Sequence, residues 1–143
     1  MLLTACGQTK VKADVPKTTE GKATQIIVEQ YINAIKTTNA DLKVSLLHDD
    51  FIFLDHGLDD GPWAKDDFSY YVHEEMANPD SSKTQIDKYI VTPDGRFVVL
   101  QRTYSQAATT TGKWETALVY GVLEFKEGKI LNETWYYNGE VFH

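Results

Sequence analysis

The chain has 143 residues, of which 42% are hydrophobic, 24% are charged and 12% are aromatic, and its formal net charge is −7. This length and apolar content predict one globular domain with a short tail, and they exclude a disordered or collagen-like chain. The acidic balance, with Arg96 and Arg102 as the only arginines, argues against nucleic-acid binding, because phosphate recognition depends on clustered Lys and Arg. No stretch approaches the roughly 18 apolar residues that a membrane-spanning helix needs.

Residues 1–22 differ in composition from the rest of the chain. The single cysteine, Cys6, excludes an internal disulfide and follows Leu3-Thr4-Ala5, an order of apolar and small residues that resembles the lipobox of bacterial lipoproteins. The basic and long apolar regions of a full signal are missing. Residues 8–22 lack apolar periodicity and are rich in Lys and Thr, so we expect a solvated tether.

The lipobox resemblance implies a lipid-anchored protein of the bacterial cell envelope. Cys6 would carry the lipid that anchors the protein to the membrane, and the Lys residues of the tether would add little to this attachment. Residues 1–22 would be a signal remnant and flexible tether, and residues 23–143 would form a domain outside the cytoplasm. The alternative is an unmodified thiol on a frayed end of the chain.

Helical periodicity begins at Ala23. Apolar residues then recur at the spacing of one helix face, as Ile27, Tyr31, Ala34 and Ile35. A shorter helix is predicted from Asp41, a buried strand over 51–54 and a loop over 57–62. A third helix over 64–77 ends before Pro79, because proline restricts its predecessor and lacks a donor.

The second half of the chain predicts strands. Runs rich in β-branched and aromatic residues, separated by short turns with Gly95 and Gly128, cover 84–92, 96–106, 114–125 and 130–137. Helices followed by such a meander indicate an α+β fold in which the N-terminal helices pack inside a curved antiparallel sheet.

The order of these elements resembles the SnoaL-like branch of the nuclear transport factor 2-like superfamily over residues 23–143. The resemblance rests on three stretches, which run from Asn39 to Phe51, from Gly61-Pro62-Trp63 to Phe68, and from Gly128 to Trp135. It implies a cone-shaped α+β barrel whose open end holds a pocket. Polyketide cyclases, steroid isomerases, dehydratases and proteins without known activity belong to this superfamily.

Strand alternation selects the residues that would face such a pocket. On the last strand Glu133 shares a face with Trp135, as well as Leu131 and Tyr137. Glu133 lies one residue further from Gly128 than the SnoaL-like pattern leads us to expect, so a bulge is needed to turn it inward. On the second long strand Arg102 shares a face with Tyr104, and the third offers either Trp114, Leu118 and Tyr120 or Glu115, Val119 and Leu123.

These residues suggest acid–base chemistry, because burial favours the neutral form of a carboxyl group and so adapts it to proton transfer. The catalytic candidates are Glu133 and Asp55 as proton carriers, with His56 and Tyr104 as donors. The ligand-binding candidates are Trp63, Tyr71, Arg102, Trp114, Tyr120 and Trp135. Each has a structural alternative: Trp114 and Trp135 as packing residues, His56 as a loop residue, and Arg102 as the ion-pair partner of a carboxylate such as Glu133. No metal or organic cofactor is expected.

Three functions remain open at this stage. The leading one is the binding of a small, largely hydrophobic molecule in the cone. The second is a cofactor-free isomerase, cyclase or dehydratase that uses a pocket carboxylate. The third is an interaction domain, with a homodimer as one form, that associates through exposed aromatic side chains such as Tyr136 and Phe142.

Overall fold

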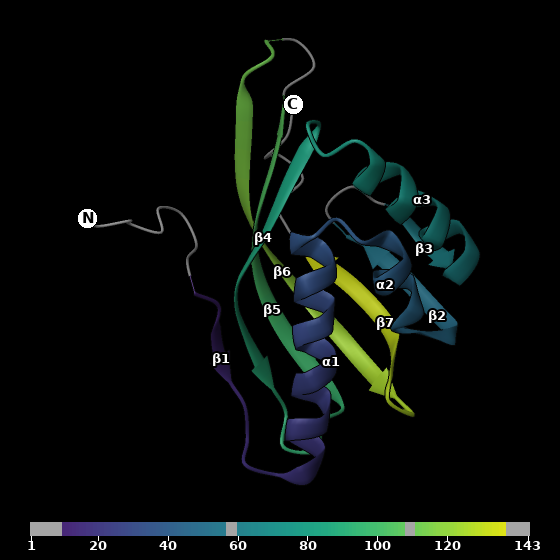
Figure 1. The fold of residues 1–143 in the computed structure, drawn as a ribbon, viewed down its shortest axis with the longest axis vertical. Helices are drawn as coiled ribbons and strands as arrows, with labels where there is room; N and C mark the ends of the chain where they lie inside the picture. The colour runs from purple at the N-terminus through teal and green to yellow at the C-terminus, as the bar shows by residue number, and fades with distance from the viewer. Residues whose placement is uncertain (1–9, 57–59, 108–110, 137–143) are drawn as a thin grey trace.

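The computed structural model describes residues 10–56, 60–107 and 111–136, and in it three helices pack against one curved, open sheet (Figure 1). In chain order the elements are β1 (Lys12–Asp14), α1 (Thr19–Lys36), α2 (Ala40–Ser45), β2 (Leu47–Asp55), β3 (Asp60–Ala64), α3 (Lys65–Ala77), β4 (Ser82–Val91), β5 (Phe97–Ala107), β6 (Trp114–Lys126) and β7 (Lys129–Tyr136). The predicted α+β class, with helices inside a curved sheet, is confirmed. Among the described residues, no helix has the length and apolar character needed to cross a membrane.

The sheet is mixed rather than wholly antiparallel, in the strand order β1-β4-β5-β6-β7-β2-β3. The strands β4 to β7 form the predicted antiparallel meander. However, β2 runs parallel to β7, and β1 runs parallel to β4. The sequence could not show this, because a tight turn fixes the direction of the strands it joins and no turn joins these pairs.

The N-terminal boundary also differs from the sequence prediction. The helix α1 begins at Thr19 rather than near Ala23, and the Thr18 side chain caps it by accepting a hydrogen bond from the Gly21 backbone N–H at 3.0 Å. This first turn is polar, so apolar periodicity does not reveal it. The segment predicted to be solvated contains β1, and the predicted loop over 57–62 contains the start of β3, while 57–59 lie outside the described residues.

One hydrophobic core fills the space between the helices and the concave face of the sheet. The side chain of Phe68 in α3 packs against two rings of β2, with centroid distances of 4.9 Å to Phe51 and 4.6 Å to Phe53. The core also contains the fully buried residues Val28, Tyr31, Val72, Val98, Leu100, Val119, Leu123, Ile130 and Trp135. Each large apolar side chain buried in this way stabilises the fold by about 1.5–3 kcal/mol.

The opposite face of the sheet exposes large apolar side chains. Paired residues share a face, and the register places Ile90 beside Val99, and Tyr120 beside Tyr136. The exposed fraction is 49% for Ile90, 40% for Val99, 46% for Tyr120 and 48% for Tyr136. We call this surface the outer face.

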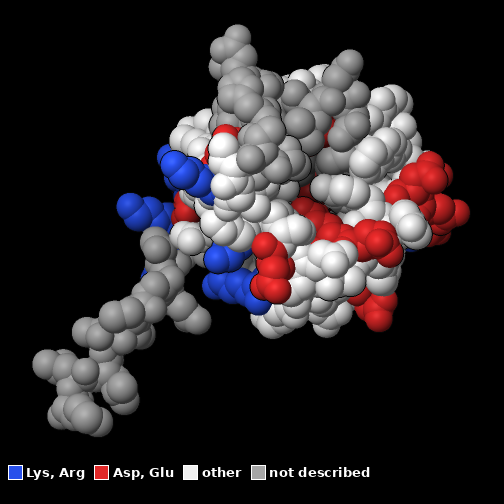
Figure 2. Space-filling view, turned by 90° about the horizontal axis from the view of Figure 1, so that it is seen from above, with Lys and Arg blue, Asp and Glu red and all other residues white. Residues whose placement is uncertain are grey.

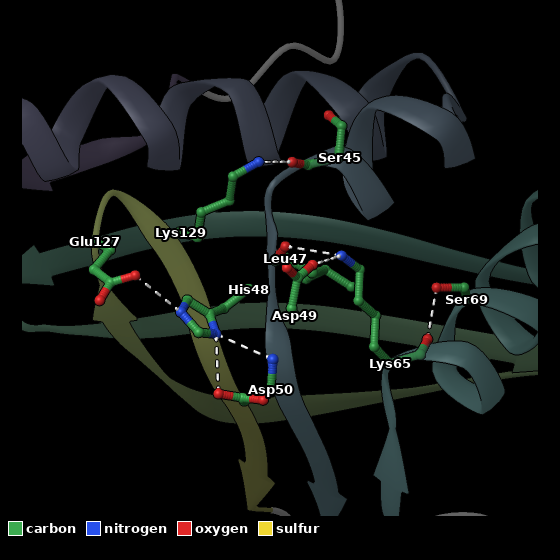
Figure 3. Close-up of polar contacts among 9 residues, drawn as sticks. All are labelled: Ser45, Leu47, His48, Asp49, Asp50, Lys65, Ser69, Glu127 and Lys129. Atoms are coloured by element: carbon green, nitrogen blue, oxygen red, sulfur yellow. Dashed lines mark hydrogen bonds and ion pairs between the residues drawn. The ribbon is translucent and has the colours of Figure 1, made fainter.

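Side-chain to backbone contacts attach the α2–β2 junction to its neighbours (Figure 3). Lys129 Nζ in β7 donates to the Ser45 carbonyl at 2.7 Å. Lys65 Nζ at the start of α3 donates to the Leu47 carbonyl at 3.3 Å and to Asp49 Oδ1 at 3.1 Å. The end of α2 is therefore held against β7 and α3, which fixes the position of α2 relative to the concave face.

Gly121 in β6 lies directly against the Trp135 ring. A Cβ at this position would lie 2.5 Å from Cζ3 of Trp135 and 2.6 Å from its Cε3. We therefore expect Gly121→Ala to lower the free energy of unfolding by about 1–3 kcal/mol and to displace the indole, because a packed ring cannot give way. Urea denaturation and tryptophan fluorescence measure the two effects.

The control is Gly128→Ala, whose Cβ would enter open space and whose cost comes from a φ of +73° alone. It should lower stability without changing the folded-state fluorescence. Unchanged stability and an unchanged spectrum in Gly121→Ala would contradict the packing described here.

Candidate functional site

Glu133 in β7 is the most deeply buried carboxylate among the described residues, with 1% of its surface exposed. Its Oε1 accepts hydrogen bonds from the Tyr31 hydroxyl and from the Trp135 Nε1, both at 2.8 Å. The Lys43 Nζ lies 3.9 Å from the same oxygen. The second oxygen, Oε2, is buried and has no hydrogen-bond partner in the described part of the chain. One oxygen is thus held in place and the other is left with open lone pairs.

A β-bulge turns Glu133 inward. Asn132 pairs with Glu124 and Ile130 pairs with Phe125, so Leu131 is an extra residue on β7. The bulge therefore absorbs the one-residue shift noted in the sequence, and Ile130, rather than Leu131, shares the core side with Glu133. Beyond the bulge, regular alternation places Trp135 on the same face as Glu133, which lets its indole reach the carboxylate.

A cavity of about 40 Å³ adjoins Glu133. Besides Phe53, Phe68 and Trp135, it is lined by the polar side chains Lys43, Asp55, Tyr71, Glu75, Arg102, Tyr104 and Glu133. We call it the inner cavity. It exceeds the roughly 10–15 Å³ that one water molecule requires. The walls therefore place three carboxylates, two cations and two phenols around a small space.

A larger hollow of about 230 Å³ shares Lys43, Glu75 and Arg102 with the inner cavity, so the two adjoin. We call it the outer groove. It lies between the end of α1, the end of α3 and the start of β4, where Lys36, Met76 and Thr84 are among its lining residues. Seen from this end of the molecule, acidic side chains lie along a hollow and basic side chains gather on one flank (Figure 2).

Arg102 does not form the ion pair that the sequence suggested. No carboxylate of the described residues pairs with it, and its buried Nε has no hydrogen-bond partner there. Its guanidinium instead stacks on the Trp135 ring, 3.6 Å from the centroid, and lies 5.2 Å from the Tyr104 centroid. Trp135 thus contacts both groups, because its Nε1 also donates to Glu133 Oε1.

The phenols of the site are proton donors at neutral pH. Burial, followed by the negative charge of Glu133, raises the pKa of Tyr31 well above its usual value. Burial and the charge of Glu75 likewise raise the pKa of Tyr71 and of Tyr104. Each hydroxyl therefore keeps its proton; Tyr31 donates it to Glu133 Oε1 at 2.8 Å, and Tyr104 directs it at Gln106 Oε1 at 3.4 Å.

Sequence reasoning missed Tyr31 and Lys43. Tyr31 lies on the apolar stripe of α1, where nothing distinguishes a hydroxyl that binds a carboxylate from a core ring. Lys43 lies in a short helix, yet it is 7% exposed, with its ammonium 5.2 Å from the Tyr31 centroid and 5.3 Å from the Phe68 centroid. Neither position has a spacing that signals a site.

Some of the candidate residues from the sequence line the inner cavity, and the others do not. Six of them line the inner cavity, namely Glu133, Asp55, Tyr104, Tyr71, Arg102 and Trp135. Trp63 does not line the cavity but packs against two residues that do, with ring-centroid distances of 5.4 Å to Phe53 and 5.2 Å to Tyr71. His56 is exposed and stacks on Tyr136 at 4.8 Å.

The prediction that Trp114 and Tyr120 line the pocket is wrong. They are 45% and 46% exposed on the outer face, because Ala117 and Val119 occupy the inward positions of β6. Of the two faces that the sequence left open for this strand, the structure thus turns the one with Glu115, Val119 and Leu123 toward the helices. The described part of the chain brings no three His, Cys, Asp or Glu side chains into a metal-binding arrangement.

Comparison with known proteins identifies the family. Residues 28–133 match the SnoaL-like domain, and the chain therefore belongs to the SnoaL-like domain family. A putative polyketide cyclase from Xanthomonas campestris pv. campestris is similar in structure, with 17% identity, a TM-score of 0.69, and coverage of 85% of this chain and 95% of that chain. An LEH-like epoxide hydrolase from M. tuberculosis has 21% identity, a TM-score of 0.65 and 89% coverage of both chains.

A third similar structure is a hypothetical protein from Catenulispora acidiphila with a ketosteroid isomerase-like fold, in complex with trimethylamine. It has 16% identity and a TM-score of 0.66, and the match covers 80% of this chain and 87% of that chain. No curated protein matched the sequence. At these identities the similarity shows the fold, so the chemistry of this chain has to be argued from its own residues.

His73 connects two helices that border the inner cavity, α3 and α2. Its Nε2 lies 2.9 Å from Asp41 Oδ1 and its Nδ1 lies 2.7 Å from the Ser69 carbonyl. The hydrogen bond to Asp41, followed by that to Ser69, raises the pKa of His73 above 6.5. We expect an NMR titration to give His73 a higher pKa in the wild type than in Asp41→Asn.

The sign of the stability effect follows from this direction. Because the folded-state pKa is raised, the contact stabilises the protein fully below the unfolded-state pKa, and the contribution is lost as the pH rises through the folded-state value. Asp41→Asn should therefore lose more stability at pH 5.5 than at pH 8.5. Equal His73 titration curves in the two proteins would contradict the contact.

Proposed function

We propose that this chain is a cofactor-independent acid–base enzyme, an isomerase, cyclase or dehydratase, in which Glu133 transfers a proton on a small carbonyl compound. The observation that carries the proposal is the state of the Glu133 carboxylate: Oε1 is fixed by two donors, and Oε2 is buried without a partner beside a cavity. A general base must be held in one orientation while its accepting oxygen remains available.

The reaction begins with a substrate whose carbonyl-adjacent C–H faces Glu133 Oε2. The carboxylate takes the proton, and the electron pair of the C–H bond moves to the carbonyl oxygen to form an enolate. The hydroxyl of Tyr71 donates to that oxygen, an interaction that contributes a few kcal/mol in a site shielded from water. In an isomerisation Glu133 then returns the proton to another carbon of the substrate. In a cyclisation the enolate carbon attacks a second carbonyl carbon of the substrate, and Glu133 protonates the alkoxide that forms. In a dehydration the enolate expels a hydroxyl group, which leaves as water with the proton from Glu133.

The character of the walls favours this role over the binding of a largely hydrophobic molecule. Apolar ligands of drug size occupy pockets of about 300–1,000 Å³ with few polar groups. The inner cavity is about 40 Å³ and is lined by Asp55, Glu75, Glu133, Lys43 and Arg102. The names of two structural neighbours, a putative polyketide cyclase and an epoxide hydrolase, agree with acid–base chemistry in this fold. Ligand binding without turnover stays the alternative, and the exposed outer face supports association with a second copy as a further one.

Glu133→Gln tests the proposal, because the amide can still accept from Tyr31 and Trp135 but cannot take a proton. We expect the wild type to accelerate the exchange of carbonyl-adjacent protons for deuterium in a panel of small ketones and keto acids, followed by NMR in D₂O. Glu133→Gln should lower this rate by about 100-fold or more. Glu127→Gln makes the same change at an exposed turn and should leave the rate unchanged.

Circular dichroism would establish that both variants are folded. Exchange at the wild-type rate in Glu133→Gln would exclude Glu133 as the base. Compounds that bind in the cavity without any accelerated exchange would support the binding role instead.

We further propose that the domain is anchored to a bacterial envelope membrane by lipid on Cys6, which lies outside the described residues. The support is the order Leu3-Thr4-Ala5-Cys6 and the polar segment that follows it. Mass spectrometry of the protein from a bacterial host should show a diacylglyceryl-modified Cys6 as the new N-terminus. An unmodified Cys6 on a protein in the soluble fraction would reject the anchor.

A further inference from the structure

We infer that the substrate of this site carries a carboxylate, and that Arg102 binds it while Glu133 acts on the neighbouring carbon. The inference rests on the proposed function and names its substrate class. It starts from a guanidinium that the described chain leaves unmatched: Arg102 has ring contacts with Trp135 and Tyr104 but no hydrogen bond or ion pair there.

The stacking of Arg102 prepares it to bind an anion. The N–H groups of a guanidinium all lie in its plane, and Trp135 occupies one face of that plane at 3.6 Å from the ring centroid. The N–H donors along the edge of the guanidinium remain available, and their spacing matches the two oxygens of a carboxylate. The buried Nε has no acceptor among the described residues, and leaving such a donor unpaired destabilises a protein until a ligand supplies one.

The carboxylates around Arg102 are already engaged within the chain. Glu133 accepts from Tyr31 and Trp135, and Glu75 accepts from the Ser82 hydroxyl at 3.5 Å. Asp55 also has an interaction partner. The unmatched hydrogen-bond donor of the inner cavity is therefore Arg102, and the buried ammonium of Lys43, which lies 3.9 Å from Glu133, is a second cation in the same wall. A substrate anion would supply the acceptor that Arg102 lacks, which a cationic group could not do.

Basic side chains also line the approach to the cavity. The outer groove is lined by Lys36 at the end of α1 and by Lys43 and Arg102 at its inner end, against Glu75. In a chain with a net charge of −7, this concentration of cations is local. Lys83 also borders the groove, but its ammonium lies over the exposed Trp114 ring at 4.8 Å. An anion would therefore be attracted through the groove toward Arg102 rather than bound generally at the surface.

The inner cavity, at about 40 Å³, has room for the reacting end of a small acid, and the rest of the molecule would extend into the adjoining outer groove of about 230 Å³. A keto acid with its carboxylate at Arg102 brings its acidic C–H within one or two bonds of the bound group, next to Glu133 in the same cavity. Proton removal then follows the balance given above: the C–H pair becomes the enolate, the proton resides on Glu133, and the carboxylate of the substrate is unchanged.

Acetoacetate and its neutral methyl ester form the matched probe pair. We expect isothermal titration at fixed ionic strength to show acetoacetate binding to the wild type about tenfold or more tightly than the ester, as charge-assisted hydrogen bonds predict. Arg102→Gln should lose this preference by weakening acetoacetate binding while leaving ester binding unchanged. Lys88→Gln removes one positive charge from an exposed position of β4 and should keep the preference.

Binding and proton exchange separate the two proposals. Glu133→Gln should bind acetoacetate at least as tightly as the wild type, so the anion preference is measured where no chemistry occurs. Equal wild-type affinity for acid and ester, or an unchanged preference in Arg102→Gln, overturns the inference even if proton exchange is catalysed. A preference that depends on Arg102 supports the anion site, including the case in which exchange is absent and only the acid–base role fails.

Discussion

The buried carboxylate of Glu133 is the constraint on which the rest of the structure depends. Burying an ionised group costs several kcal/mol unless hydrogen bonds and charges replace its water. Here the replacement comes from three elements: Tyr31 in α1, Lys43 in α2 and Trp135 in β7 itself. The helices must therefore sit where they do against the sheet. A shift of α1 along the sheet would remove the Tyr31 hydroxyl from Glu133 and leave the charge uncompensated.

The same dependence explains why small features far from the cavity matter to it. The bulge at Leu131 decides whether Glu133 faces the core or the outer face, because one residue reverses the direction of every side chain beyond it. Gly121 leaves room for the Trp135 ring, and Lys129 holds the end of α2 against β7. The orientation of one carboxylate thus depends on a β-bulge, on a glycine that leaves room for a ring, and on a surface lysine.

What the sequence could predict is what local patterns encode. Periodicity located α3 and the meander to within a few residues, since both are set by nearest-neighbour alternation and by glycine turns. The polar first turn of α1 and the parallel pairing of β2 with β7 have no such pattern. Alternation on β6 gave two possible faces, and the packing of Ala117 and Val119 against the helices selected one of them.

The site shows the same limit more sharply. Glu133, Arg102, Tyr104 and Trp135 were predictable as neighbours, because they occupy alternate positions on two strands of one sheet. Tyr31 and Lys43 were not, because their roles depend on how helices dock, and helix docking is set by contacts that are distant in the sequence. The expected Arg102–Glu133 pair failed for a related reason: the indole that separates them is on the same strand as the glutamate.

That separation is what makes the arrangement suitable for chemistry. An ion pair between Arg102 and Glu133 would satisfy both groups and leave neither for a substrate. Instead, Trp135 donates its N–H to Glu133 at 2.8 Å and stacks its ring on Arg102 at 3.6 Å, so that one indole contacts both groups. Each unmatched buried atom, Glu133 Oε2 and Arg102 Nε, costs about 1–3 kcal/mol, which the packed core has to offset. A bound molecule that supplies the missing partners would remove this destabilisation. Two unmatched groups of opposite charge in one small cavity therefore specify a molecule that has both an acidic C–H and an anionic group.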